Sequence, residues 1–124
     1  DIEIIEHHHS RKIDAPSGTA VSLTEAIVKS TGRDASKDVI HGRHGEAGVR
    51  PQRQIGVHAI RMGETVGHHE VHFSGPGETV TLGHTAHSRD TFARGALQAA
   101  NWIHGKPAGR YTMTDVLGTS EASL

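Results

Sequence analysis

Apolar residues alternate with polar ones in four short segments of the chain, and each alternation predicts a β-strand. The first segment, residues 2–7, places Ile2 and Ile4 on one face and Glu3 on the other. The other three, at about residues 55–61, 66–73 and 79–86, are separated by short turns that contain glycine. We expect these three strands to form an antiparallel meander. The sheet as a whole is then a mixed, largely antiparallel, four-stranded open sheet.

Two other segments carry apolar residues at the spacing of a helix. The first covers about residues 17–31, with Ser17 as a suitable N-cap and Gly32 as a suitable C-cap. The second covers about residues 89–104 and has a broad, alanine-rich apolar face. We expect the first helix to pack on the sheet and the second to be a separate C-terminal helix. These elements predict an α+β (α/β) fold.

The long segment between the first helix and the second strand, residues 32–53, is polar and rich in glycine. We expect a loop there, with a short strand at most near residues 39–40. A loop of this length inside a compact domain is usually functional or covers another subunit.

Composition narrows the class of protein. Only 34% of the 124 residues are hydrophobic and 3% are aromatic, so the core is thin, which suggests burial against another domain or against further copies. A net charge of −1 gives no reason to expect a nucleic-acid partner. The sequence has no cysteine and no apolar run of about 20 residues, so we expect neither disulfides nor a membrane partner, and a cytoplasmic location.

The first residue is not methionine, and residues 1–6 already read as the middle of a strand. We therefore expect this sequence to be a piece of a longer chain, with a partner domain on its N-terminal side.

The densest chemistry lies between residues 7 and 20. Three consecutive histidines and Lys12 precede a predicted helix start at Ser17, Gly18 and Thr19. Backbone N–H groups at a helix start bind carboxylate or phosphate, lysine adds a full charge, and histidine transfers protons near neutral pH. This pattern predicts a site for a small anionic, carboxylate-bearing molecule that needs a proton. An ordinary capped helix after a polar loop is the alternative.

A metal site built from His7, His8 and His9 is a second interpretation. Consecutive residues of a strand point to opposite faces, so at most two of the three share one. Zinc usually requires three protein ligands, and nothing in the sequence shows that further histidines converge. We expect no metal ligand in this chain. A non-catalytic, histidine-rich metal- or anion-binding module and a purely structural assembly domain stay open as other classes of function.

Four stretches of the chain resemble one known family, dihydrodipicolinate reductase (4-hydroxy-tetrahydrodipicolinate reductase). They are Glu6-x-His8-His9-x-x-Lys12-x-Asp14-Ala15-Pro16-Ser17-Gly18-Thr19-Ala20, Ile55 to Arg61, Val66 to Phe73 and His84 to Ala96. The closing Asp115-Val116-Leu117 is similar as well. Two stretches depart from the family pattern, since His7 usually corresponds to a small residue and residues 46–51 fit loosely, so neither is given a role.

The resemblance implies an oxidoreductase of lysine and diaminopimelate biosynthesis that uses NADPH or NADH. It implies that residues 1–88 are a substrate-binding and tetramerisation domain and that residues 89–118 pack on an N-terminal Rossmann domain outside this sequence. Residues 119–124 are expected to be a disordered tail. The implied partners are a small dicarboxylate substrate, the Rossmann domain and three further copies in a homotetramer. On its own, the chain is expected to be inactive and to hold no cofactor tightly.

The resemblance also implies roles for individual residues. His8 and Lys12 match the catalytic pair, in which His8 is the proton donor or acceptor and Lys12 a proton donor and carboxylate partner. The residues that match the substrate-carboxylate site are His9, Lys12, Ser17, Gly18 and Thr19. Arg89 and Phe92 match positions near the nicotinamide end of the cofactor.

Overall fold

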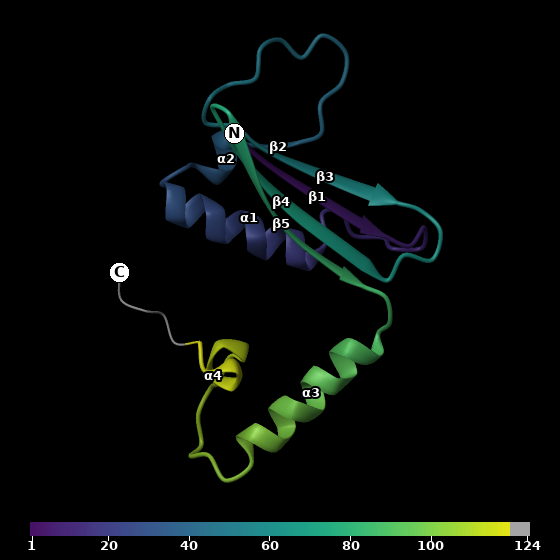
Figure 1. Ribbon diagram of the computed structural model, residues 1–124, viewed down its shortest axis with the longest axis vertical. Helices are drawn as coiled ribbons and strands as arrows, with labels where there is room; N and C mark the ends of the chain where they lie inside the picture. Colours follow the sequence, from purple (N-terminus) through teal and green to yellow (C-terminus); the bar gives the residue numbers. More distant parts are fainter. Residues whose placement is uncertain (120–124) are drawn as a thin grey trace. The chain divides into compact units, whose positions relative to one another are not determined.

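The computed structural model describes residues 1–119 and has two compact units, Asp1–His87 and a second that begins at Ser88 (Figure 1). The first unit contains β1 (Ile2–His8), α1 (Gly18–Thr31), α2 (Ala35–Asp38), β2 (Val39–His41), β3 (Ile55–Arg61), β4 (Gly67–Gly75) and β5 (Glu78–Ala86). The second contains α3 (Asp90–Ile103) and α4 (Met113–Leu117). The predicted C-terminal tail lies outside the described residues, apart from residue 119.

The sheet has five strands in the order β2-β3-β1-β4-β5. The fold class is confirmed, but the expected count of four strands is wrong. The short segment near residues 39–40 is a strand in its own right, because Val39–His41 pairs in parallel with the first residues of β3.

The expected meander is also wrong at its first link. β1 lies between β3 and β4, parallel to β3 and antiparallel to β4. The segment that joins β3 to β4 therefore crosses the C-terminal end of β1. It is bonded there, because Met62 donates its N–H to the carbonyl of His8 at 2.9 Å and Ser10 donates to the carbonyl of Gly63 at 3.1 Å. The first strand is thus central, with neighbours that satisfy its backbone on both sides.

The core lies between α1 and one face of the sheet, and its centre is β1 (Figure 1). Ile4 is fully buried and stands between Val57 of β3 and Val71 of β4. Ala20 and Ile27 of α1 pack against these side chains from the helix side of the core. At the far edge the layer is incomplete, because Val80 and Leu82 of β5 remain 54% and 62% exposed. The thin core expected from composition is therefore one apolar layer with an uncovered side.

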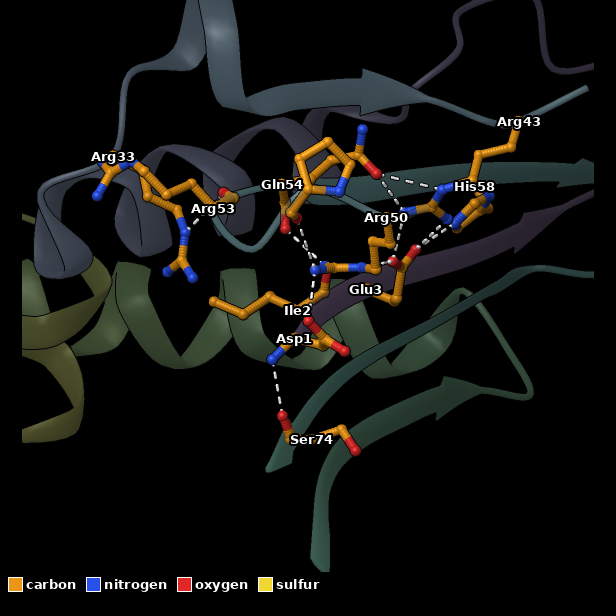
Figure 2. Close-up of polar contacts among 11 residues, drawn as sticks. Asp1, Ile2, Glu3, Arg33, Arg43, Arg50, Arg53, Gln54, His58 and Ser74 are labelled. Atoms are coloured by element: carbon orange, nitrogen blue, oxygen red, sulfur yellow. Dashed lines mark hydrogen bonds and ion pairs between the residues drawn. The ribbon is translucent and has the colours of Figure 1, made fainter. Parts of the chain in front are cut away.

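The other face of β1 carries Glu3, which holds the long loop that precedes β3 (Figure 2). Arg43 and Arg50, both from that loop, donate to its carboxylate at 2.8 and 3.0 Å, and His58 of β3 contacts it at 2.6 Å. Arg50 also donates to the carbonyls of Ile2 and Gln54. The loop is therefore fastened to the sheet by charge-assisted hydrogen bonds rather than by apolar packing.

Gly56, next to Glu3 on β3, is required by this arrangement. A Cβ atom on Gly56 would lie 1.8 Å from Oε2 of Glu3 and 2.9 Å from Nε2 of His58. Any side chain there would displace the carboxylate that fastens the loop.

In the second unit, α3 and α4 contact each other, and the bounds of α3 are close to the predicted residues 89–104. Trp102 of α3 packs edge-on against Tyr111, and the Lys106 ammonium lies 4.4 Å from the Trp102 ring centroid. Ser88 accepts a hydrogen bond from the N–H of Asp90, although the N-cap position itself is Arg89. Within this unit, Phe92, Leu97 and Ile103 of α3 remain exposed.

Replacement of Ile4 by alanine tests the central place of β1. We expect Ile4→Ala to lower the free energy of unfolding by about 2–5 kcal/mol, because a fully buried side chain is removed and a cavity is left. Urea denaturation followed by circular dichroism measures the change. Ile13→Ala is the control, since Ile13 is 98% exposed and should change stability by less than about 0.5 kcal/mol. Similar effects of both substitutions would contradict the assigned core.

Candidate functional site

A buried carboxylate stands at the C-terminal end of β1, on the face that α1 covers. Glu6 is 0% exposed, and four donor atoms surround its two oxygens. Oε1 accepts from the Ser17 N–H at 2.9 Å and from Arg61 at 2.7 Å. Oε2 accepts from Arg61 at 2.8 Å and contacts Nδ1 of His8 at 2.6 Å. A buried charge with this many partners stays ionised, since each oxygen lone pair is satisfied.

The pKa of Glu6 follows from these contacts. Burial raises it, but the hydrogen bonds from Arg61, His8 and the Ser17 N–H prevail and lower the pKa from 4.5 to about 2. The hydrogen bonds between Arg61 and Glu6 also raise the pKa of Arg61. Both groups are therefore charged throughout the neutral range.

Arg61 also connects the loop after β1 to this carboxylate. Besides its two bonds to Glu6, it donates to the carbonyl of Asp14 at 2.8 Å. The side chain of Asp14 pairs with the Lys12 ammonium at 2.8 Å, and this lowers the pKa of Asp14. A continuous chain of contacts thus runs from His8 through Glu6 and Arg61 to the loop that carries Lys12.

Ser17 joins the same cluster to the start of α1. Its Oγ accepts the N–H of Ala20 at 3.2 Å as the N-cap, and the same atom lies 3.0 Å from Nε2 of His69. A hydroxyl has one donor and two acceptor sites, so beside its bond from Ala20 it has a site for either direction of the bond with His69. Ser17 is only 2% exposed, whereas Gly18 and Thr19 are exposed at the first turn, where a helix has no backbone acceptor for their N–H groups.

The surroundings of His69 favour its neutral form. Burial lowers its pKa, and the neighbouring His8 lowers it further. Its ring meets that of His8 edge-on, with centroids 5.1 Å apart. A neutral imidazole carries its proton on one of its two nitrogens, so the tautomer of His69 sets the direction of its hydrogen bond with Ser17.

The structure brings His8, Lys12 and Ser17 into one connected cluster, with Gly18 and Thr19 directly beyond it. His9 lies in the turn before Lys12, where its carbonyl accepts the Lys12 N–H at 3.1 Å. Arg89 and Phe92 belong to the second unit, so their predicted place beside a nicotinamide stays a prediction.

Sequence reasoning missed three members of the cluster, namely Glu6, Arg61 and His69. A signal for Glu6 was present. It continues the apolar alternation of Ile2 and Ile4, and a carboxylate at a buried strand position must have a partner. Arg61 and His69 stand opposite His8 and Glu6 on neighbouring strands, and strand pairing is what identifies them.

The histidines do not gather into a metal centre. His7 faces away from His8 and meets His68 on the opposite side of the sheet, with ring centroids 4.8 Å apart. Within residues 1–119, no group of three or more histidine, aspartate or glutamate side chains is placed to hold a metal ion. None of the helices in that part of the chain is long and apolar enough to span a bilayer.

Comparison with known proteins identifies relatives of the whole segment. The family model described as dihydrodipicolinate reductase, C-terminus, matches residues 1–117. A 4-hydroxy-tetrahydrodipicolinate reductase of Anaeromyxobacter sp. (strain Fw109-5) is 54% identical over 98% of this chain and 46% of its own length. One from Psychrobacter arcticus is 50% identical over 98% of this chain and 44% of its own. The chain thus spans about half the length of these relatives.

A solved structure shares the fold. It is a dipicolinate-bound dihydrodipicolinate reductase from Paenisporosarcina sp. TG-14, which matches with a TM-score of 0.60 and 28% identity over 83% of this chain and 39% of the other.

Acid should weaken the fold through Glu6 and Glu3, the two glutamates that arginine and histidine hold ionised. The folded-state pKa of Glu6 is below its ordinary value, so its contribution is complete above about pH 4.5 and is lost as the pH falls toward about 2. That contribution is on the order of 3 kcal/mol at neutral pH. Glu3, whose pKa is also lowered to about 2 by Arg43, His58 and Arg50 against its burial, adds a second loss in the same range.

Urea titrations at about pH 6 and about pH 3 measure this loss. We expect Glu3→Gln to lose less stability between the two pH values than the wild type, with the remaining loss due largely to Glu6. Equal losses in the two proteins would contradict the assigned ion pair of Glu3.

Proposed function

This chain belongs to the dihydrodipicolinate reductase family, whose C-terminal domain it matches, and we propose that it holds the substrate and handles the proton in that reduction. The reaction is the NAD(P)H-dependent conversion of 4-hydroxy-tetrahydrodipicolinate to tetrahydrodipicolinate, in lysine and diaminopimelate biosynthesis in the cytoplasm. The observation that carries the proposal is the cluster around Glu6. It joins an imidazole, a lysine-bearing loop and a helix N-terminus at one end of β1.

In the proposed complex, the two carboxylates of the substrate are bound by cations and backbone donors. Lys12 supplies the charge, and its present partner Asp14 is exposed enough to be replaced by a substrate carboxylate. Gly18 and Thr19 offer N–H groups at the positive end of the α1 dipole. His9 completes the proposed set. Ser17 contributes mainly by position, because its N–H and hydroxyl already bind Glu6, Ala20 and His69.

His8 is the proposed proton carrier, with Lys12 as the second catalytic residue. The imidazole is held by a carboxylate on one nitrogen, which leaves the other nitrogen to exchange a proton with the substrate. The bound dicarboxylate is thereby oriented against a fixed acid, and orientation of this kind supplies much of a catalysed rate.

The dinucleotide is not proposed to bind mainly in this chain. The segment between β1 and α1 carries His9 and Lys12 where a dinucleotide site has a glycine fingerprint, and such donors suit a small dicarboxylate. When bound, NADPH or NADH supplies a hydride. We place its main site in an N-terminal Rossmann domain of the full-length enzyme, with Arg89 and Phe92 near its nicotinamide end.

The apolar surfaces left uncovered support the two proposed protein partners. The exposed side chains on α3 suit packing of residues 89–118 on the Rossmann domain, and the exposed Val80 and Leu82 suit burial against further copies in a homotetramer.

Titration with pyridine-2,6-dicarboxylate, followed by calorimetry, tests the substrate site. We expect the chain to bind this dianion and Lys12→Ala to bind it roughly 10- to 100-fold more weakly, because a hydrogen bond to a charged group contributes about 1.5–3 kcal/mol. The chain alone should not oxidise NADPH with substrate present.

Lys29→Ala is the matched control, since it removes the same charge from the exposed last turn of α1. Its affinity should equal that of the wild type. Absence of binding by the wild type, or equal weakening by both substitutions, would count against the proposed site.

Light scattering tests the proposed assembly. We expect a particle of four times the 13.3 kDa mass of the chain, because the core is too thin to leave β5 uncovered. A monomer at all concentrations measured would contradict the tetramer and leave the substrate site to be judged by titration.

A further inference from the structure

We propose that Glu6 is the positioning residue of His8, which it fixes in the tautomer that carries its neutral-state proton on Nδ1, and that Arg61 holds Glu6 in this role. The inference rests on the proposed function for its purpose, since it explains which nitrogen of His8 would meet the substrate. The contacts from which we infer the tautomer all lie inside the first unit.

The first step is the distance between the two groups. Nδ1 of His8 lies 2.6 Å from Oε2 of Glu6, which is short even for a charge-assisted hydrogen bond. At this distance one of the two atoms must carry a proton, because two facing lone pairs would repel each other. The choice is between a carboxylic acid that donates to the imidazole and an imidazole N–H that donates to the carboxylate.

Arg61 decides between these two forms. It donates one N–H to each oxygen of Glu6, and the Ser17 N–H adds a further donor to Oε1. A neutral carboxylic acid would forfeit the charge attraction of the guanidinium on both of its oxygens, and this attraction is what makes these bonds strong. The carboxylate therefore stays ionised and acts only as an acceptor, so the proton resides on Nδ1 of His8.

The consequence concerns the second nitrogen. With the proton on Nδ1, the neutral ring presents the lone pair of Nε2, and the protonated ring has an Nε2–H to give. Nε2 lies above Gly67 of β4, where a Cβ atom would be only 3.4 Å away, so the glycine leaves room beside this nitrogen. His69 meets the ring edge-on and limits its rotation. Proton exchange is thus directed to one defined atom.

Serine proteases also use a carboxylate to orient the histidine that transfers the proton. In serine proteases, replacement of the carboxylate that orients the catalytic histidine lowers kcat about 10⁴-fold, chiefly because the wrong tautomer forms. A positioning carboxylate is therefore capable of a large effect without any contact with the substrate.

The ¹⁵N resonances of the imidazole rings test the inference without a substitution. In a long-range ¹H–¹⁵N spectrum of the chain with its imidazole rings in the neutral form, we expect Nδ1 of His8 at the position of a protonated nitrogen and Nε2 at that of an unprotonated one. A His8 ring with its proton on Nε2, or an even mixture of both tautomers, would overturn the proposal.

Two matched variants then attribute the tautomer to Glu6. In Glu6→Gln, the Nδ1 and Nε2 resonances of His8 should move toward each other, because an amide both donates and accepts and so no longer selects one tautomer. Glu3→Gln makes the same change on the same strand, in a network that also contains arginine and histidine, and should leave the His8 resonances in place. An unchanged His8 in a folded Glu6→Gln variant would overturn the assignment.

The readout is independent of ligand binding. If pyridine-2,6-dicarboxylate fails to bind while His8 shows the expected tautomer, the proposed function fails and the positioning of His8 by Glu6 stands. If the dianion binds but His8 shows the other tautomer, the positioning proposal fails alone. If Glu6→Gln does not fold, the spectrum of the wild type still decides which nitrogen of His8 carries the proton, and a proton on Nε2 would overturn the proposal.

Discussion

The ion pair of Glu6 and Arg61 is the interaction on which the site depends. A glutamate that is 0% exposed is tolerated only because the guanidinium takes both oxygens and the Ser17 N–H and His8 supply the remaining donors. Removal of either partner would leave an uncompensated buried charge, and such a loss costs about 3–5 kcal/mol. The bonds around this one carboxylate fix the positions of the helix start, the His8 imidazole and the loop that carries Lys12.

β1 performs two tasks because its residues alternate between the two faces of the sheet. Ile2, Ile4 and Glu6 face α1, so the apolar core and the site form one continuous layer. Glu3 faces the other way and fastens the long loop through Arg43 and Arg50 (Figure 2). Glu6 and Glu3 are each surrounded by arginine and histidine, yet of these two clusters only the one around Glu6 lies beside a helix N-terminus. This difference explains why the cluster around Glu6 suits a ligand site and the cluster around Glu3 fastens a loop.

Local patterns in the sequence predicted the elements well and their neighbours poorly. The periods of two and 3.6 residues placed the four longer strands and the two main helices close to their observed bounds, since amphipathic faces are a local property. The order of strands was not accessible in this way, because the pairing of β1 with both β3 and β4 joins residues more than fifty positions apart. Of the site, His8, Lys12 and Ser17 were predicted from one stretch, whereas Arg61 and His69 come from strands that meet it only in the fold.

The spacing of Glu3 and Glu6 on β1 bears on how the sheet avoids misassembly. A slip of one residue between β1 and its neighbours would turn Glu3 toward α1 and Glu6 toward the opposite face. Each carboxylate would then be separated from the guanidinium groups that neutralise it, and Ile4 would leave the core. An incorrect register would thus be penalised by charge as well as by lost apolar burial. The ion pairs that build the site therefore also favour the correct register of β1 over registers shifted by one residue.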